Sequence, residues 1–338
     1  MKKLFLLAIM TLVILAGCNN EQTGADSKSG SSSGKPTQAR IFMVPSGNDF
    51  LIASGMAQLA TEKGEDIKYT ISDDPGNMSS IRKVMQGKGE LTNIVGANAV
   101  FAYNGTHVFE GEQYKDLRAV VSVPAPIVQF IVREDSGINS LADFKDNATI
   151  GTFQGSAHNT VNLIMKQAGK KLDEDYNLQT LPGPEQIDAL KDGAIEALVT
   201  WSTIPSPGYV GLDQTTSIKI LPIEEEILHA MHEELDPGAE LFTVPKGVYS
   251  GQTEEALTSK STRYFITNAE VDEKIIYDFT KFLLENAQEL VKYHPSAEEI
   301  TLENAIKGIT VPLHPGAVKY YQEQGIEIPD EIMPPESN

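Results

Sequence analysis

The sequence predicts an α/β protein with two lobes, each organised around a mostly parallel β-sheet. The first observation is a repeat of apolar strand-like runs, polar loops and segments of helical periodicity, as in 39–44 and 51–62. The second is Pro124-Ala125-Pro126, which separates two strand-like runs and predicts a hinge between lobes. Without the N-terminal leader and tether about 300 residues remain, which suffices for two lobes of ordinary size.

The N-terminus reads as a secretion leader followed by a lipid attachment point. Residues 1–17 carry Lys2 and Lys3 before a short apolar run, which is typical of a signal peptide and too short to span a membrane. The leader ends in Leu15-Ala16-Gly17-Cys18, which resembles a bacterial lipobox and predicts lipid on Cys18. An incidental cysteine after an ordinary secretion signal is the alternative. Residues 18–38 are polar and Ser/Gly-rich, and we expect a flexible tether.

Composition excludes several classes of function. The chain holds 27 Lys plus Arg against 47 Asp plus Glu, a net charge of −20 that becomes −22 once Lys2 and Lys3 are removed. This charge argues against nucleic acid as a partner. Cys18 is the single cysteine, so neither an intramolecular disulfide nor a cysteine-based metal site is available. An apolar fraction of 41% is enough for a packed core.

Candidate ligand-binding residues follow from the loops. In sheets of this kind ligands bind beyond the carboxyl ends of the strands. We therefore expect one cluster from the polar loops at 45–49, 73–77, 96–98, 151–158 and 200–206. None of these loops contains Lys or Arg, which favours a single carboxylate or a zwitterion held by amides and hydroxyls over a polyanion. The candidates are Ser46, Gly47, Asn48, Asn77, Asn98, Gln154, Ser156, Ala157, His158, Trp201 and Ser202.

Each candidate also has a structural interpretation. The stretch 151–169 predicts strand, loop and helix with Ser156 as N-cap, and taken alone it favours an ordinary connection without a ligand. Trp201 could form a wall of the cleft or pack in the core. Asp49, Asp73 and Asp74 could pair with an amino group of the ligand or remain solvated turn residues. Arg82, just beyond one loop, could reach inward or lie on the surface.

Catalysis and metal binding are the weaker interpretations. Ser156 and His158 are close in sequence, but the segment lacks the second glycine of a Gly-x-Ser-x-Gly elbow. His229 and His232 have a spacing that could ligate a metal, although a solvated acidic helix explains the surrounding glutamates. We expect no catalytic residue, metal or cofactor. Thr267-Asn268-Ala269-Glu270 fits a capping box and predicts a helix to about residue 292.

The C-terminal part carries a family resemblance. Ile309 to Ala317 (ITVPLHPGA), followed by Lys319-Tyr320-Tyr321 and Gly325, resembles the C-terminal signature of TAXI proteins, the substrate-binding proteins of one branch of TRAP transporters. Segments within 128–143 and at 189–193 are also similar, and the likeness spans about 40–325. The first loop departs from the family, because Asn48 and Asp49 replace small residues and Phe50-Leu51 stand where tyrosines are usual.

The resemblance implies a two-lobed, type II periplasmic-binding-protein fold. It divides the chain into lobe I (39–125 with 243–328), lobe II (126–242) and a loose tail (329–338). The ligand implied is a glutamate-like amino acid or organic acid, delivered to a TRAP-type transporter that an ion gradient drives.

The sequence therefore predicts an extracytoplasmic solute-binding protein, monomeric and lipid-anchored to the outer face of the cell membrane. A membrane-tethered ligand sensor or interaction module with the same fold is the alternative, and a cleft enzyme is a third.

Overall fold

A computed structural model describes residues 37–45, 47–145, 147–153 and 156–335. The predicted leader, the lipid site at Cys18 and nearly all of the tether lie outside these residues. Thr37 and Gln38, expected at the end of the tether, already belong to the first strand. Within the described part of the chain, none of the helices has the length and apolarity needed to cross a membrane.

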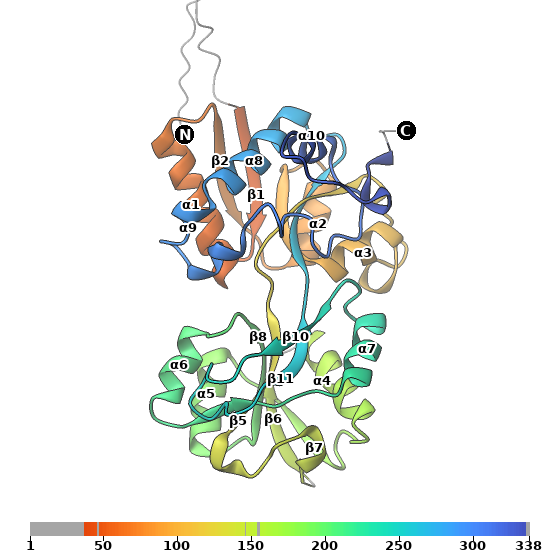
Figure 1. The fold of residues 1–338 in the computed structure, drawn as a ribbon. Coiled ribbons are helices and arrows are strands. Elements are labelled where there is room, and N and C mark those ends of the chain that lie inside the picture. The colour runs from red at the N-terminus through yellow and green to blue at the C-terminus, as the bar shows by residue number, and fades with distance from the viewer. Residues whose placement is uncertain (1–36, 46, 146, 154–155, 336–338) are drawn as a thin grey trace, which may run out of the picture. The chain divides into compact units, whose positions relative to one another are not determined.

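The first sheet contains five strands in the order β2-β1-β3-β12-β4. Strands β1 and β2 of this sheet are labelled in Figure 1. Strand β1 pairs in parallel with both β2 and β3, whereas β12 is antiparallel to β3 and β4. Their bounds are β1 Thr37–Met43, β2 Ile67–Asp73, β3 Leu91–Val95, β4 Leu117–Ser122 and β12 Arg263–Asn268.

The second sheet contains seven strands in the order β10-β11-β5-β8-β6-β7, with β9 pairing beside β5. Strand β6 is parallel to β7 and β8, and β5 is antiparallel to β8, β9 and β11. Both sheets are thus mixed rather than mostly parallel. The bounds are β5 Ile127–Arg133, β6 Ala148–Thr152, β7 Tyr176–Thr180, β8 Ala197–Ser202, β9 Ile218–Ile220, β10 Glu240–Val244 and β11 Ala256–Lys260.

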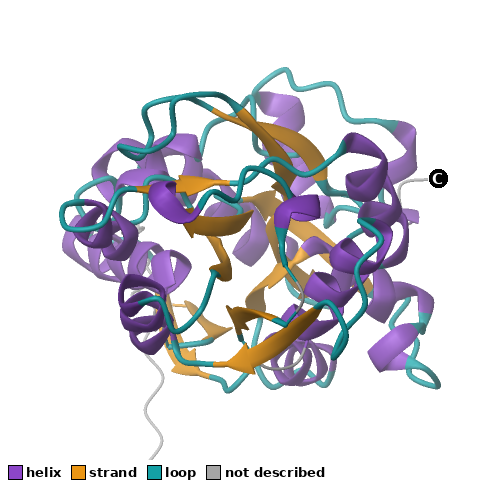
Figure 2. Ribbon diagram, turned by 90° about the horizontal axis from the view of Figure 1, so that it is seen from below, coloured by secondary structure: helices purple, strands orange, loops and turns teal. Residues whose placement is uncertain are grey.

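Helices lie on both sides of the strands (Figure 2). The α-helices are α1 Gly47–Lys63, α2 Asn77–Met85, α3 Gly96–Asn104, α4 Ser156–Gln167, α5 Gly183–Asp192, α6 Pro207–Asp213, α7 Glu225–Glu234, α8 Glu273–Glu285, α9 Ala287–Leu290 and α10 Pro315–Glu323. Because the sheets are covered on both faces, central strands are apolar on both. In β5, for example, Phe130 and Ile131 belong to different core clusters although they are neighbours in sequence.

The chain passes between the two sheets twice, and the two passes are hydrogen-bonded to each other. One pass connects β4 to β5 through Pro124-Ala125-Pro126, and the other connects β11 to β12 through Ser261 and Thr262. The Val123 N–H donates to the Arg263 carbonyl at 2.9 Å, and the Ser261 N–H donates to the Pro126 carbonyl at 3.0 Å. These two segments, here called the crossover, place the ends of β4, β5, β11 and β12 together.

The predicted second boundary between lobes was wrong. We expected the chain to return to lobe I at residue 243, but β10 and β11 belong to the second sheet. Lys260 of β11 pairs with Ile127 of β5, and Val244 and Ala256 are buried in the second body. The return therefore lies at Ser261 and Thr262. A hairpin of two short strands has no sequence feature that assigns it to one sheet or the other.

Two further predictions in the C-terminal part were wrong. Thr267 and Asn268 end β12, and α8 begins at Glu273 after Asp272, whose side chain accepts the N–H of Lys274 at 2.8 Å. Asn268 instead accepts the N–H of Glu270 in a turn. The expected loose tail is packed as far as residue 335, because Ile332 is buried and its carbonyl accepts the N–H of Leu313 at 2.8 Å.

Burial of Asp236, beside the crossover, makes stability depend on pH. Its carboxylate accepts the hydroxyl of Ser261 at 2.6 Å, and burial raises the pKa of Asp236 to about 6. This pKa is higher than that of the same carboxyl group in the unfolded chain, so protonation of Asp236 stabilises the folded protein. This contribution to the free energy of unfolding is complete below about pH 4 and is lost as the pH rises through 6. We expect Asp236→Asn to remove this loss and raise the free energy of unfolding at pH 7 by about 2 kcal/mol.

Urea denaturation at pH 4.5 and pH 7 measures the effect. Asp135→Asn is the matched control, because the Asp135 side chain is 81% exposed. The argument would be contradicted if the free energy of unfolding changed between pH 4.5 and pH 7 by the same amount in Asp236→Asn as in the wild type.

Candidate functional site

A cleft of about 320 Å³ lies between the two sheets at the crossover. The first body contributes Asn48, Asp49, Asn77, Asn93 and Arg263, together with the end of β1. The second body contributes Trp201, Ser202 and Thr203 from the end of β8, and Pro124 and Pro126 of the crossover form part of the wall. We call this the ligand cleft.

Strand direction explains why polar groups meet there. Met43 of β1 pairs with Asp73 of β2 in a parallel register, so the helices that follow both strands begin at the same sheet edge. Helix α2 has no side-chain cap at its N-terminus. The first N–H groups of a helix lack intrahelical partners and carry partial positive charge, which suits an anionic ligand group.

The centre of the first-body wall is an ion pair between Asp49 and Arg263. The Arg263 Nη1 donates to the Asp49 carboxylate and lies 3.5 Å from Asn93 Oδ1. The two charged side chains are only 21% and 20% exposed. Burial lowers the pKa of Arg263 to about 10, so the guanidinium stays protonated at neutral pH. The pair therefore offers a cation and an anion side by side, partly shielded from water.

Arg263 overturns the inference that no cation lines the site. That inference considered loops that follow strands, whereas Arg263 is the first residue of β12. Strand β12 runs antiparallel to β3, with Arg263 opposite Val95, so its beginning lies at the end of β3. The alternation in 263–268 was a usable signal, but we assigned its end to a helix cap.

The second-body wall is held in place by buried hydrogen bonds. Gln129, fully buried on β5, donates from Nε2 to Ser202 Oγ at 2.8 Å and to the Ser202 carbonyl at 2.9 Å. Asn48 Nδ2 donates to Thr203 Oγ1 at 2.9 Å and so links the two walls directly. Trp201 is half-buried and lines the cleft.

The predicted site residues divide into three groups. Asn48, Asn77, Trp201 and Ser202 line the ligand cleft. Asn98, Ala157 and His158 are not among the described residues that line it, and the His158 ring bonds to Thr180 Oγ1 at 2.9 Å. Ser46 and Gln154 lie outside the described residues, and Gly47 and Ser156 are placed only as the first residues of α1 and α4.

The other charged candidates have structural partners. Asp74 is buried, where it accepts the N–H of Gly76 and the hydroxyl of Ser79 and pairs with Lys83 at 2.6 Å. Of the three loop aspartates, only Asp49 lines the cleft. Arg82 does not reach inward, because it pairs with Glu112 at 2.7 Å and stacks on Phe109.

The histidines of α7 also have partners of their own. His232 bonds to Ser259 Oγ at 2.8 Å, and His229 pairs with Glu225 at 3.3 Å. Burial is the larger of two effects that lower the pKa of His232, the second being the charge of His229. Over the residues that the structure describes, no group of three or more His, Cys, Asp or Glu could hold a metal ion.

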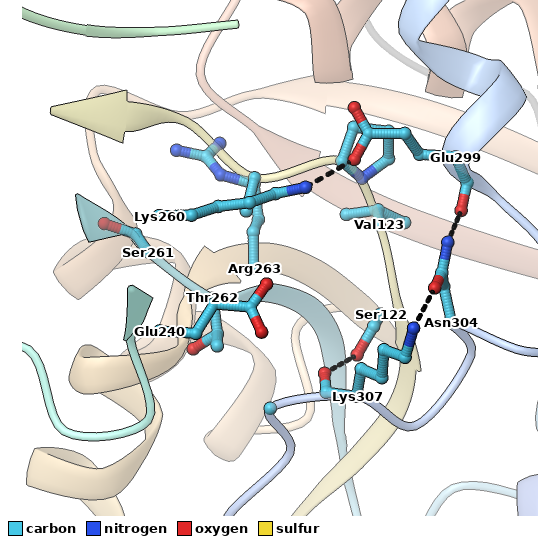
Figure 3. A pocket seen from close by; sticks show the side chains of 13 residues that line it. Ser122, Val123, Glu240, Lys260, Ser261, Thr262, Arg263, Glu299, Asn304 and Lys307 are labelled. Carbon is cyan, nitrogen blue, oxygen red and sulfur yellow. Dashed lines mark hydrogen bonds and ion pairs between the residues drawn. The ribbon is translucent and has the colours of Figure 1, made fainter. Parts of the chain in front are cut away.

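A second pocket of about 170 Å³ uses other faces of the crossover (Figure 3). Several of its polar groups bond to one another: Lys260 pairs with Glu299 at 2.7 Å, Lys307 donates to Asn304 at 2.8 Å, and Ser122 donates to the Lys307 carbonyl at 2.7 Å. These groups satisfy one another without a ligand. The ligand cleft is larger and presents side-chain amides and hydroxyls, so it is the better candidate site.

Two α/β bodies joined by paired crossovers, with a polar cleft between them, form the two-lobed architecture that a TctC solute-binding protein also has, and the prediction of a two-lobed α/β fold is confirmed. The sequence profile of the NMT1-like family matches residues 44–325, and the chain belongs to this family.

Solved structures show the same architecture at low sequence identity. A TctC solute-binding protein from Polaromonas matches with a TM-score of 0.50 and 14% identity, over 80% of this chain and 89% of that one. The periplasmic aliphatic sulphonate-binding protein SsuA from Escherichia coli matches with a TM-score of 0.48 and 18% identity, over 85% and 83% of the two chains. Both proteins are named as binding proteins.

The contrast between Asn77 and His158 tests the placement of the cleft. Asn77→Ala removes a lining amide and should weaken binding about tenfold, the value of roughly one hydrogen bond to a charged group. His158→Ala, on α4 and bonded to Thr180, should leave affinity within about twofold. Calorimetric titration with the amino or organic acid that most raises the melting temperature measures both. Equal losses for the two variants would move the site toward α4.

Proposed function

We propose that this protein captures a small amino acid or organic acid in the ligand cleft and delivers it to a membrane transporter. The observation that carries the proposal is the partly buried Asp49–Arg263 pair in a cleft lined by amides and hydroxyls. A guanidinium suits a ligand carboxylate, and Asp49 suits a ligand ammonium group. Asn48, Asn77 and Ser202 would add hydrogen bonds that orient the ligand.

Closure of the two bodies on the ligand would follow from the crossover. In the part of the chain that the structure describes, two short segments connect the bodies, and one of them contains Pro124 and Pro126. Asn48 and Thr203 already make a contact across the cleft. A ligand touching Arg263 on one wall and Ser202 on the other would stabilise the closed arrangement by its differential affinity for it.

We further propose a TRAP-type partner, in keeping with the resemblance at 309–325 and with membership of the NMT1-like family. The sensor alternative shares the fold and the cleft, so transport decides between them. The proposal predicts that uptake of the ligand stops when the ion gradient is collapsed and continues when ATP is depleted. Ligand binding in cells that show no dependent uptake would favour the sensor.

Arg263 provides the direct test of the site. We expect Arg263→Ala to lose at least about a hundredfold in affinity, because the ligand carboxylate loses a charged partner and Asp49 is left unpaired. The measurement is native mass spectrometry of residues 36–338, followed by identification of the released molecule and calorimetric titration with it.

Lys307→Ala is the matched control for Arg263→Ala, since Lys307 lines the second pocket. It should bind as the wild type does. Because Arg263 lines both pockets, the decisive outcome is that of Lys307→Ala: loss of the bound small molecule in this variant would place the site in the second pocket instead.

Membrane attachment through Cys18 is proposed from the lipobox-like sequence. We expect Cys18→Ser to shift the protein from the membrane fraction to the soluble fraction, since the sulfur that would carry the lipid is removed. Labelling with palmitate and fractionation measure this. Incorporation of label into Cys18→Ser would contradict the assignment.

A further inference from the structure

We propose that the ligand cleft selects a zwitterionic amino acid with an uncharged, apolar side chain. This inference rests on the proposed function and narrows its substrate class. It departs from the glutamate-like ligand that the family resemblance implies.

The first argument is charge balance. Asp49 and Arg263 are the only charged residues among the described residues that line the cleft, and their charges cancel. An α-amino acid places an ammonium group on Asp49 and a carboxylate on Arg263, and the cleft remains neutral.

A second carboxylate has no counterpart in this arrangement. Glutamate would bring one extra negative charge into a partly buried site. The Arg263 guanidinium would already be paired with Asp49 and with the α-carboxylate of the ligand. An uncompensated charge in such surroundings is unfavourable, and the net charge of −20 increases the penalty.

An organic acid without an amino group is disfavoured for a related reason. Its carboxylate would compete with Asp49 for the Arg263 guanidinium and bring two carboxylates together. Like charges at such a distance repel, and one of them would have to be protonated or displaced. The amino group of the ligand is therefore the feature that satisfies Asp49.

The second argument is the presence of exposed apolar residues on the elements around the cleft. Leu51 and Met78 are large hydrophobic residues that are 49% and 42% exposed. Leu51 lies one helical turn beyond the cleft residue Asn48 on α1. Met78 follows the cleft residue Asn77 in the first turn of α2.

The second body contributes a matching residue. Phe153 is 37% exposed and directly follows β6, which runs parallel to β8 with Gly151 opposite Leu198. Because β8 ends in Trp201, Phe153 and Trp201 belong to the same edge of the sheet. In this proposal these apolar residues flank the mouth of the cleft and would be covered by the apolar side chain of a ligand whose charged end is held at Arg263.

Calorimetric titration of the wild type with four probes tests the inference. The probes are L-leucine, L-phenylalanine, L-glutamate and 4-methylpentanoate, the last being leucine without its amino group. We expect leucine or phenylalanine to bind at least about tenfold more tightly than both glutamate and 4-methylpentanoate. Tighter binding of glutamate, or equal binding of leucine and 4-methylpentanoate, would overturn it.

The variant Asp49→Asn tests the charge argument independently. It removes the negative partner, so the affinity ratio of leucine to 4-methylpentanoate should fall at least about tenfold. Glu303→Gln, whose side chain is 85% exposed and lies outside the cleft, should leave that ratio unchanged. An unchanged ratio in Asp49→Asn would overturn the role of Asp49, and the wild-type titrations stand even if this variant fails to fold.

The outcomes also separate this inference from the proposed function. If only glutamate or 4-methylpentanoate bound, and this binding were lost in Arg263→Ala, the proposed solute-binding function would stand. The selectivity for an apolar amino acid would be overturned. Failure of all four probes to bind would overturn the selectivity. Failure of every amino and organic acid to raise the melting temperature would overturn the proposed function as well.

Discussion

The arrangement of the site depends on the pairing of the two chain crossings. Backbone hydrogen bonds from Val123 to Arg263 and from Ser261 to Pro126 join the two segments that, among the described residues, connect the sheets. The pairing fixes where β12 begins and hence puts Arg263 at the edge of the first sheet where the helices α1 and α2 start. The cation of the site is thus supplied by a residue that is also part of the connection between the two bodies.

This position has an electrostatic consequence. A guanidinium at the crossover is shielded by both bodies, and burial lowers its pKa without removing its charge. Asp49 in the first turn of α1 compensates that charge in the unliganded protein and is also favoured there by the helix dipole. A ligand must therefore replace or extend an existing ion pair, which gives the site selectivity for the charge pattern of the ligand as well as for its size.

Much of the fold could be predicted from local pattern, and the central part of the site could not. The loops after β1, β2 and β8 were identified because strand, loop and helix signals repeat, and they supplied Asn48, Asn77, Trp201 and Ser202. Arg263 was missed because its strand is antiparallel and comes about 170 residues after its neighbour β3. The β10–β11 hairpin was assigned to the wrong lobe for the same reason, since only long-range pairing decides its sheet.

The residues that carry the family resemblance serve the fold rather than the ligand. His314 is buried at the start of α10, where Nδ1 accepts the N–H of Gly316 at 3.1 Å and Nε2 contacts the Val271 carbonyl at 3.1 Å. Tyr321 donates to the Val120 carbonyl at 2.7 Å inside the first body. A signature of this kind identifies relatives that share the packing of lobe I, and it carries no information about the cleft. The substrate class must therefore be argued from the residues of the cleft itself, above all Asp49 and Arg263.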